Sequence, residues 1–134
     1  MIWIDCLMNR EAVATLYASS HGLERMDVLE VTLHREGPTM RLRADLARFP
    51  DRPPRRWAPS ANTAQVTLDF LAVTDLALRG FGVSTAAALT VEQAEEGRLR
   101  FNVGGADTHV SGTCAGLRLV GISAYAVEVD APRP

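Results

Sequence analysis

The sequence predicts a mainly β protein, built as an antiparallel two-layer sandwich or a strongly curled sheet with one short N-terminal helix. Most of the chain alternates apolar and polar residues with a period of two, as a half-buried strand does. The alternating segments come in pairs, separated by short turns rich in Gly, Pro or charge. One early segment has helical spacing instead. These observations give about seven or eight strands and one helix. The alternative is an α+β arrangement, with the helix on one face of a single sheet.

The 134 residues suit a single domain that spans residues 1–134 and buries a continuous core. A net charge of −2 disfavours a dedicated nucleic-acid binder, although every one of the 14 basic residues is Arg. We see no basic leader, and no apolar run near the roughly 18 residues of a membrane span. We therefore expect a cytoplasmic protein in which Cys6 and Cys114 are reduced thiols.

The helix is predicted over residues 9–18. Asn9 can cap it, and Glu11 suits its first turn because the helix dipole favours negative charge there. The apolar residues with three-and-four spacing form one face, which we expect to cover the sheet: Val13, Leu16 and Tyr17.

The strand pattern is clearest over residues 28–46. Leu29, Val31 and Leu33 are expected to face the core, and His34 to face solvent. The turn at residues 36–39 contains Gly37 and Pro38, and a second strand follows it. Further strands are predicted near residues 65–70, 75–79, 89–91 and 99–103, with two more between 109 and 129. Near Gly121 we expect a bulge that returns Ile122 to the core face.

Residues 50–62 interrupt this pattern with four prolines, which cannot donate to a β ladder. The segment is expected to be a stiff crossover on the surface. Trp57 admits two interpretations. It can fold back as a plug at one end of the core, since tryptophan is highly buried on average. Alternatively, it is an exposed aromatic anchor beside Arg55 and Arg56, a composition found at binding hot spots. The plug is the preferred interpretation.

The sequence contains no catalytic or metal-binding motif. Asp107, His109 and Cys114 are the only local set that resembles a catalytic triad. His109 and Cys114 are an odd number of residues apart, so one unbroken strand would place them on opposite faces. The three histidines lack the paired spacing of zinc ligands, and neither cysteine belongs to a C-x-x-C unit. We predict no catalytic residue and no metal site.

Several motifs, taken in order, resemble the Immunity protein 50 family of bacterial polymorphic toxin systems. The similarity covers roughly residues 3–82. Its elements are Trp3, LYASSHGL at 16–23, VLEVTLHREGPTMRLRADL at 28–46, FPDRPPRRW at 49–57, Asn62 with the strand that follows, and VTDLALRGFG at 73–82. The resemblance implies a non-enzymatic protein that binds and neutralises a cognate toxin domain by stoichiometric occlusion. It implies no cofactor, and a protein partner in place of nucleic acid or membrane.

Many delivered toxins are nucleases with basic clefts, so acidic residues are the candidates for partner binding. They are Glu92, Glu95, Glu96 and Asp107, followed by Asp69 and Asp75. Two other functions remain open. A small β-rich ligand-binding or self-assembling module would show an apolar pocket or a self-complementary edge. A small enzyme would need a pocket with convergent polar groups, for example around Cys114.

Overall fold

The computed structural model describes residues 2–127. Within this range the secondary structure is η1 (Trp3–Cys6), α1 (Glu11–Ala14), β1 (Arg25–His34), β2 (Thr39–Leu46), β3 (Thr63–Leu71), β4 (Thr74–Arg79), β5 (Ala86–Gln93), η2 (Glu95–Gly97), β6 (Leu99–Gly105), β7 (His109–Cys114) and β8 (Gly116–Tyr125). The prediction of a mainly β chain with one short N-terminal helix is confirmed. The end of the last predicted strand, at residue 129, lies outside the described residues.

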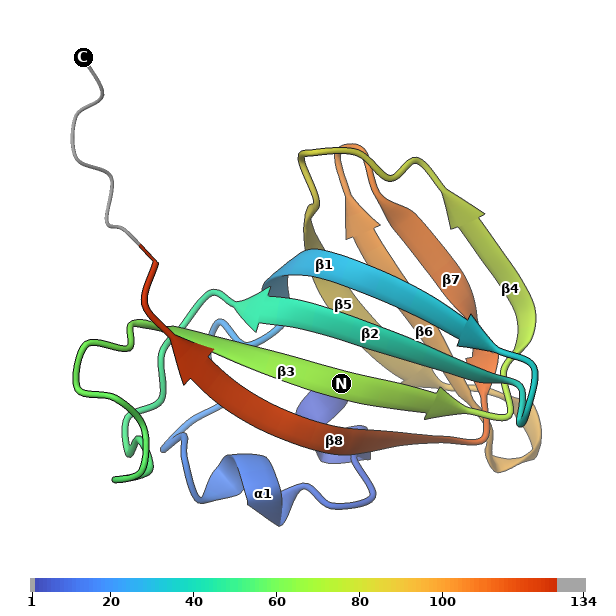
Figure 1. Cartoon of the computed structure of the whole chain (residues 1–134). Helices are drawn as coiled ribbons and strands as arrows, with labels where there is room; N and C mark the ends of the chain where they lie inside the picture. The colour runs from blue at the N-terminus through green and yellow to red at the C-terminus, as the bar shows by residue number, and fades with distance from the viewer. Residues whose placement is uncertain (1, 128–134) are drawn as a thin grey trace.

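All eight strands of the described chain belong to one antiparallel sheet, in the order β4-β7-β6-β5-β1-β2-β3-β8. The sheet does not close, and it folds over on itself (Figure 1). Strands β1, β2, β3 and β8 form one half, and β5, β6, β7 and β4 form the other, at a steep angle behind it. The two halves are joined by a short pairing between Arg25–Asp27 of β1 and Ala86–Ala88 of β5. The strongly curled sheet is thus the form that the chain adopts.

The core lies between the two halves of the sheet. The rings of Phe70 in β3 and Phe101 in β6 meet across it, with centroids 4.5 Å apart. The N-terminal segment, which contains η1 and α1, packs along the lower side in Figure 1. Trp3 is fully buried there, and its indole N–H donates to the carbonyl of Leu23 at 2.8 Å. No helix in residues 2–127 is long and apolar enough to cross a membrane.

Four local predictions prove wrong. Trp57 is only partly buried and lies outside the core, whose buried tryptophan is Trp3. Leu29 is exposed, since a bulge between Val28 and Glu30 changes the phase of β1, and Val28 faces the core instead. Leu33 is also exposed, because it lies at the end of β1, beyond the core. Asn9 does not cap α1: its side chain bonds to Leu119 of β8, and Arg10 holds the cap position without a side-chain bond.

Other local predictions are confirmed. Val13 and Tyr17 are buried and Leu16 packs against the core, although the helix itself covers only Glu11–Ala14. His34 is exposed on the outer face of the sheet. The register of β8 shifts beside Gly121, and Ile122 then packs against the core, as a bulge at this position requires.

Candidate functional site

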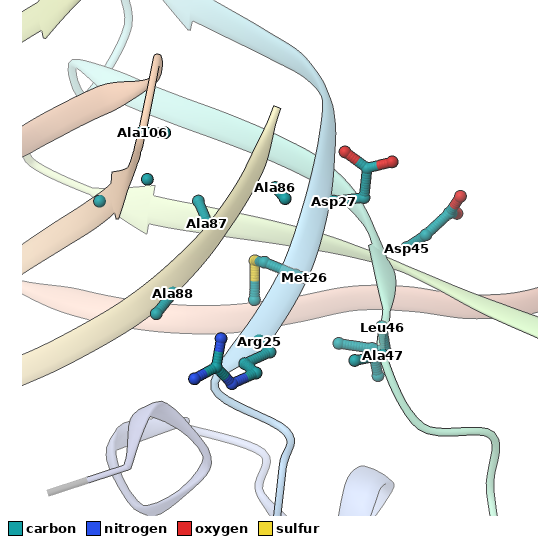
Figure 2. A pocket seen from close by; sticks show the side chains of 12 residues that line it. Arg25, Met26, Asp27, Asp45, Leu46, Ala47, Ala86, Ala87, Ala88 and Ala106 are labelled. Atoms are coloured by element: carbon teal, nitrogen blue, oxygen red, sulfur yellow. The ribbon is translucent and has the colours of Figure 1, made fainter. Parts of the chain in front are cut away.

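A groove of about 550 Å³ lies on the outer face of the sheet, where the two halves meet (Figure 2). Small residues of β5, β6 and the turn after β6 form much of its lining: Ala86, Ala88, Gly104, Gly105 and Ala106. At one of these positions, Gly105, the close approach of β5 and β6 requires glycine. A Cβ on Gly105 would lie 2.1 Å from the carbonyl oxygen of Ala86. The fold therefore leaves a shallow depression that large side chains do not fill.

Two carboxylates stand side by side at this groove. Asp27 of β1 and Asp45 of β2 are directly opposite each other in the ladder, an arrangement that is unfavourable for like charges. The Thr85 hydroxyl donates to Asp27 at 2.7 Å, and the Gln65 amide donates to Asp45 at 3.2 Å. Within residues 2–127, no arginine forms an ion pair with either carboxylate. Neutral donors thus hold the pair in place without cancelling its charge.

Tyr125 is a third neutral hydrogen-bond donor to this acidic pair. Its hydroxyl donates to the Asp45 carboxylate. Burial, and then the neighbouring Asp45, raise the pKa of Tyr125 to about 12, because both disfavour a second negative charge. The phenol therefore remains a proton donor across the neutral range. Figure 2 shows Asp27 and Asp45 beside each other, with Arg25 lower down near Ala88.

This arrangement is suited to binding a positive group. Two carboxylates whose hydrogen-bond donors are all neutral can also accept hydrogen bonds from a guanidinium or ammonium group of a partner. The described residues contain no group of three His, Cys, Asp or Glu side chains that could hold a metal ion. Asp27 and Asp45 were not among the residues predicted from the sequence. The alternation of apolar and polar residues over 40–46 indicates that Asp45 faces solvent, but only the register of β1 against β2 reveals that two acids face each other.

Four of the six predicted acidic residues lie toward the end of β6 that is opposite the groove, on different strands of this half of the sheet. Glu95 and Glu96 lie in η2, which precedes β6, and Glu92 lies close by on β5, paired with Arg100 at 3.4 Å. Asp75 follows Thr74, whose hydroxyl accepts a hydrogen bond from Arg98 just beyond η2. Asp107 is separate from these four. It lies exposed in the turn after β6, next to Ala106 of the groove.

Asp69 differs from the other five predicted acids, because it is only 4% exposed. Arg41 donates two hydrogen bonds to its carboxylate, at 2.8 and 3.0 Å, and Arg118 donates a third at 3.3 Å. Hydrogen bonding from Arg41, and then from Arg118, holds the pKa of Asp69 below its usual value although burial acts in the opposite direction. Its charge is therefore compensated within the chain, in a row that crosses β2, β3 and β8.

The one set that resembled a catalytic triad is not assembled. Cys114 is 1% exposed and belongs to the core, whereas His109 lies on the outer face of β7. Burial raises the pKa of the Cys114 thiol to about 11, so it is a thiol and not a thiolate at neutral pH. The opposite-face prediction for this pair is confirmed.

The family relationship follows from the sequence as a whole. The family model for Immunity protein 50 matches residues 9–125. The chain belongs to this family. The match extends well beyond the residues 3–82 on which the resemblance was based, through β5 to β8. A search of curated proteins and a search of solved structures found no match.

Two of the motifs that carried the family resemblance dock onto each other in the structure. Arg48, next to FPDRPPRRW, donates to the carbonyls of Ser19 and His21, at 2.5 Å each. Arg52 donates to the carbonyls of Ala14 and Thr15, at 2.9 and 3.0 Å, which satisfies the C-terminal end of α1. These contacts hold the proline-rich segment against LYASSHGL and its surroundings. This part of the family pattern builds a scaffold.

Proposed function

We propose that the chain neutralises a bacterial toxin domain by binding it in a stoichiometric complex that occludes its active surface. The observation that carries this proposal is the family match over residues 9–125 of the 134-residue chain. The proposal places the protein in the cytoplasm of the toxin-producing bacterium, as part of a polymorphic toxin system. Occlusion needs a stable scaffold with a complementary surface, and it requires neither a cofactor nor a catalytic group.

The proposal includes a role for the acidic residues. Glu92, Glu95, Glu96 and Asp75 are exposed, and Asp107 lies near the acidic groove at the other end of β6. Such charges attract a basic partner over a distance and orient it before contact, which raises the association rate more than the final affinity. Asp69 contributes differently, by fixing Arg41 and Arg118 on the outer face.

The function is tested with the neighbouring genes. We expect the gene immediately upstream to encode a large secreted protein whose last domain is the toxin. Co-expression of this chain should restore growth of cells that produce that domain, and the two purified proteins should form a 1:1 complex. Failure of both the growth rescue and the complex would refute the proposed function.

The acidic residues are tested by charge reversal. The Glu95→Lys/Glu96→Lys variant should associate with the toxin domain about tenfold more slowly at low salt, because it replaces attraction by repulsion. The difference should shrink at high ionic strength. Stopped-flow mixing at two salt concentrations measures it. The matched control is Asp5→Lys/Glu11→Lys, which changes the charge equally at two other exposed acids. Equal rates for the two variants would remove Glu95 and Glu96 from the proposal.

A further inference from the structure

The segment between β2 and β3 divides into two parts with different roles in the fold. Its first part is bound to the N-terminal segment through Arg48, Asp51 and Arg52. Its second part includes Arg55 and Arg56, both exposed. Within residues 2–127, neither of these arginines has a hydrogen bond or ion pair from its side chain. The nearest acid in sequence, Asp51, is already held by Arg48 and the backbone N–H of Ala18.

Trp57 follows these two arginines and lies outside the buried core. Its ring is partly buried and lies against the Phe49 ring, with centroids 5.8 Å apart and planes tilted by 59°. Trp3 already supplies the buried indole of the core. The Trp57 ring therefore leaves part of its apolar surface exposed, next in sequence to two uncompensated guanidinium groups.

The second part is also stiff before any partner arrives. The backbone N–H of Trp57 donates to the carbonyl of Pro54 at 3.1 Å. This bond closes a turn with Arg55 and Arg56 at its two central positions. Pro53, Pro54 and Pro59 restrict the backbone on both sides. A segment held in one conformation loses less entropy on binding, so its contacts yield more affinity.

We infer that Arg55, Arg56 and Trp57 form the contact surface that anchors the toxin domain to this chain; the inference rests on the proposed function. Tryptophan and arginine are the residues most enriched at binding hot spots. The guanidinium groups of Arg55 and Arg56 have no acidic partner within residues 2–127. They can therefore bind carboxylates of the toxin domain in bidentate pairs. The matching site on the toxin is an acidic patch beside an apolar pocket that takes the indole. The acidic residues of this chain act over longer range, on the overall charge of a basic partner.

The experiment compares two variants with one control, using the catalytically inactivated toxin domain encoded upstream as the probe. The variants are Trp57→Ala and Arg55→Glu/Arg56→Glu. The control is Arg35→Glu/Arg79→Glu, which reverses two other exposed arginines that have no ion pair in residues 2–127. Calorimetric titration gives Kd, and a thermal melt of each variant alone verifies its folding. The double charge reversal changes only exposed side chains, so it remains informative if Trp57→Ala does not fold.

Each outcome decides the inference. We expect Kd to rise about 30-fold or more in both variants, and to stay within about twofold in the control. Wild-type binding with unchanged Kd in the folded variants would overturn the inference and leave the proposed function intact. Absence of wild-type binding and of growth rescue would remove the proposed function, and the inference with it. A single-stranded RNA of mixed sequence serves as a second probe. If the wild type bound it and Arg55→Glu/Arg56→Glu did not, the surface would be a nucleic-acid site and the inference wrong.

Discussion

Two asparagines use their side-chain amides as substitutes for backbone peptide groups, one beside β8 and one just beyond its end. Asn9 donates to the carbonyl of Leu119 at 2.9 Å and accepts from its N–H at 3.0 Å. Asn62 does the same with Val127, at 2.7 and 2.8 Å. β8 is an edge strand, and unpaired edge groups are a template for unwanted pairing. Asn9 protects the middle of that edge without adding a strand.

Replacing Asn9 should show how much the stability of the fold depends on its hydrogen bonds to β8. Asn9→Ala leaves the N–H and carbonyl of Leu119 without their partner, which we expect to lower the free energy of unfolding by about 1–3 kcal/mol. Urea denaturation measures the loss, and hydrogen exchange at the Leu119 amide should accelerate. Asn102→Ala is the control, because Asn102 is exposed and its side chain forms no hydrogen bond in the described chain. Equal stability of the two variants would show that solvent replaces the Asn9 amide at no cost.

Cys114 should give the protein a stability that declines in alkali. Burial, the largest influence, raises the pKa of its thiol from 9.0 to about 11. Between these values the unfolded chain releases the proton while the folded chain retains it, so the free energy of unfolding falls as pH rises. The full effect of two pKa units is about 3 kcal/mol. The absence of lysine leaves few other groups that titrate in this range.

The comparison with Cys114→Ala isolates this effect. Urea denaturation at pH 8 and pH 10.5 should show a smaller loss of stability in the variant than in the wild type. The variant is less stable at pH 8, since it loses a buried sulfur, so the pH dependence and not the absolute value is the result. An identical decline in both proteins would assign the alkaline loss to the other groups whose pKa values are raised, which are Cys6 and the two tyrosines.

At the scale of elements, the segment 47–62 is held by a few arginine contacts in place of a regular structure. Arg48 is the centre of this docking. Its guanidinium lies over the Tyr17 ring, 5.1 Å from the centroid, and forms an ion pair with Asp51 at 3.1 Å. The Tyr17 hydroxyl in turn donates to the backbone carbonyl of Arg48 at 2.7 Å. The planar guanidinium serves these partners together, which an ammonium group cannot do.

Arg48→Lys should therefore be costly although it conserves the charge. We expect a loss of about 1–3 kcal/mol in the free energy of unfolding, because lysine cannot reach both the Ser19 and His21 carbonyls from one planar group. Proteolysis within residues 47–62 should accelerate at the same time. Arg55→Lys is the matched control, since its side chain makes no such contact in residues 2–127. A loss in the control as large as in Arg48→Lys would contradict the docking role.

The elements differ in how well the sequence predicts them. Strands follow from alternation, because each half of the sheet has one apolar and one polar face. The phase of β1 does not follow from alternation, since no residue pattern in the sequence indicates the bulge at Leu29. The prediction for Trp57 was wrong because average burial favours the interior for either tryptophan, and only the structure shows that Trp3 is the buried one. The groove could not be predicted, because Asp27 and Asp45 meet only through the strand register.

At the scale of the whole molecule, one short junction determines how the sheet folds over. Only three residue pairs join β1 to β5, and from there the two halves diverge around the core. Gly105 lies at this junction, opposite Ala87 in the ladder between β5 and β6. The acidic groove lies over the same place, so the close packing of β5 and β6 sets both the bend of the sheet and the depth of the groove.

Gly105→Ala should loosen this junction. Its Cβ would lie 2.1 Å from the carbonyl oxygen of Ala86, so β5 and β6 must move apart. We expect a loss of about 1–3 kcal/mol in the free energy of unfolding. Hydrogen exchange should accelerate in residues 25–27 and 86–88 before the rest of the sheet, because those residues join the halves. Gly121→Ala is the control, since its Cβ would meet no atom within 4 Å. If exchange accelerated evenly through all eight strands in Gly105→Ala, the junction would be an ordinary part of the core and not the point from which the fold opens.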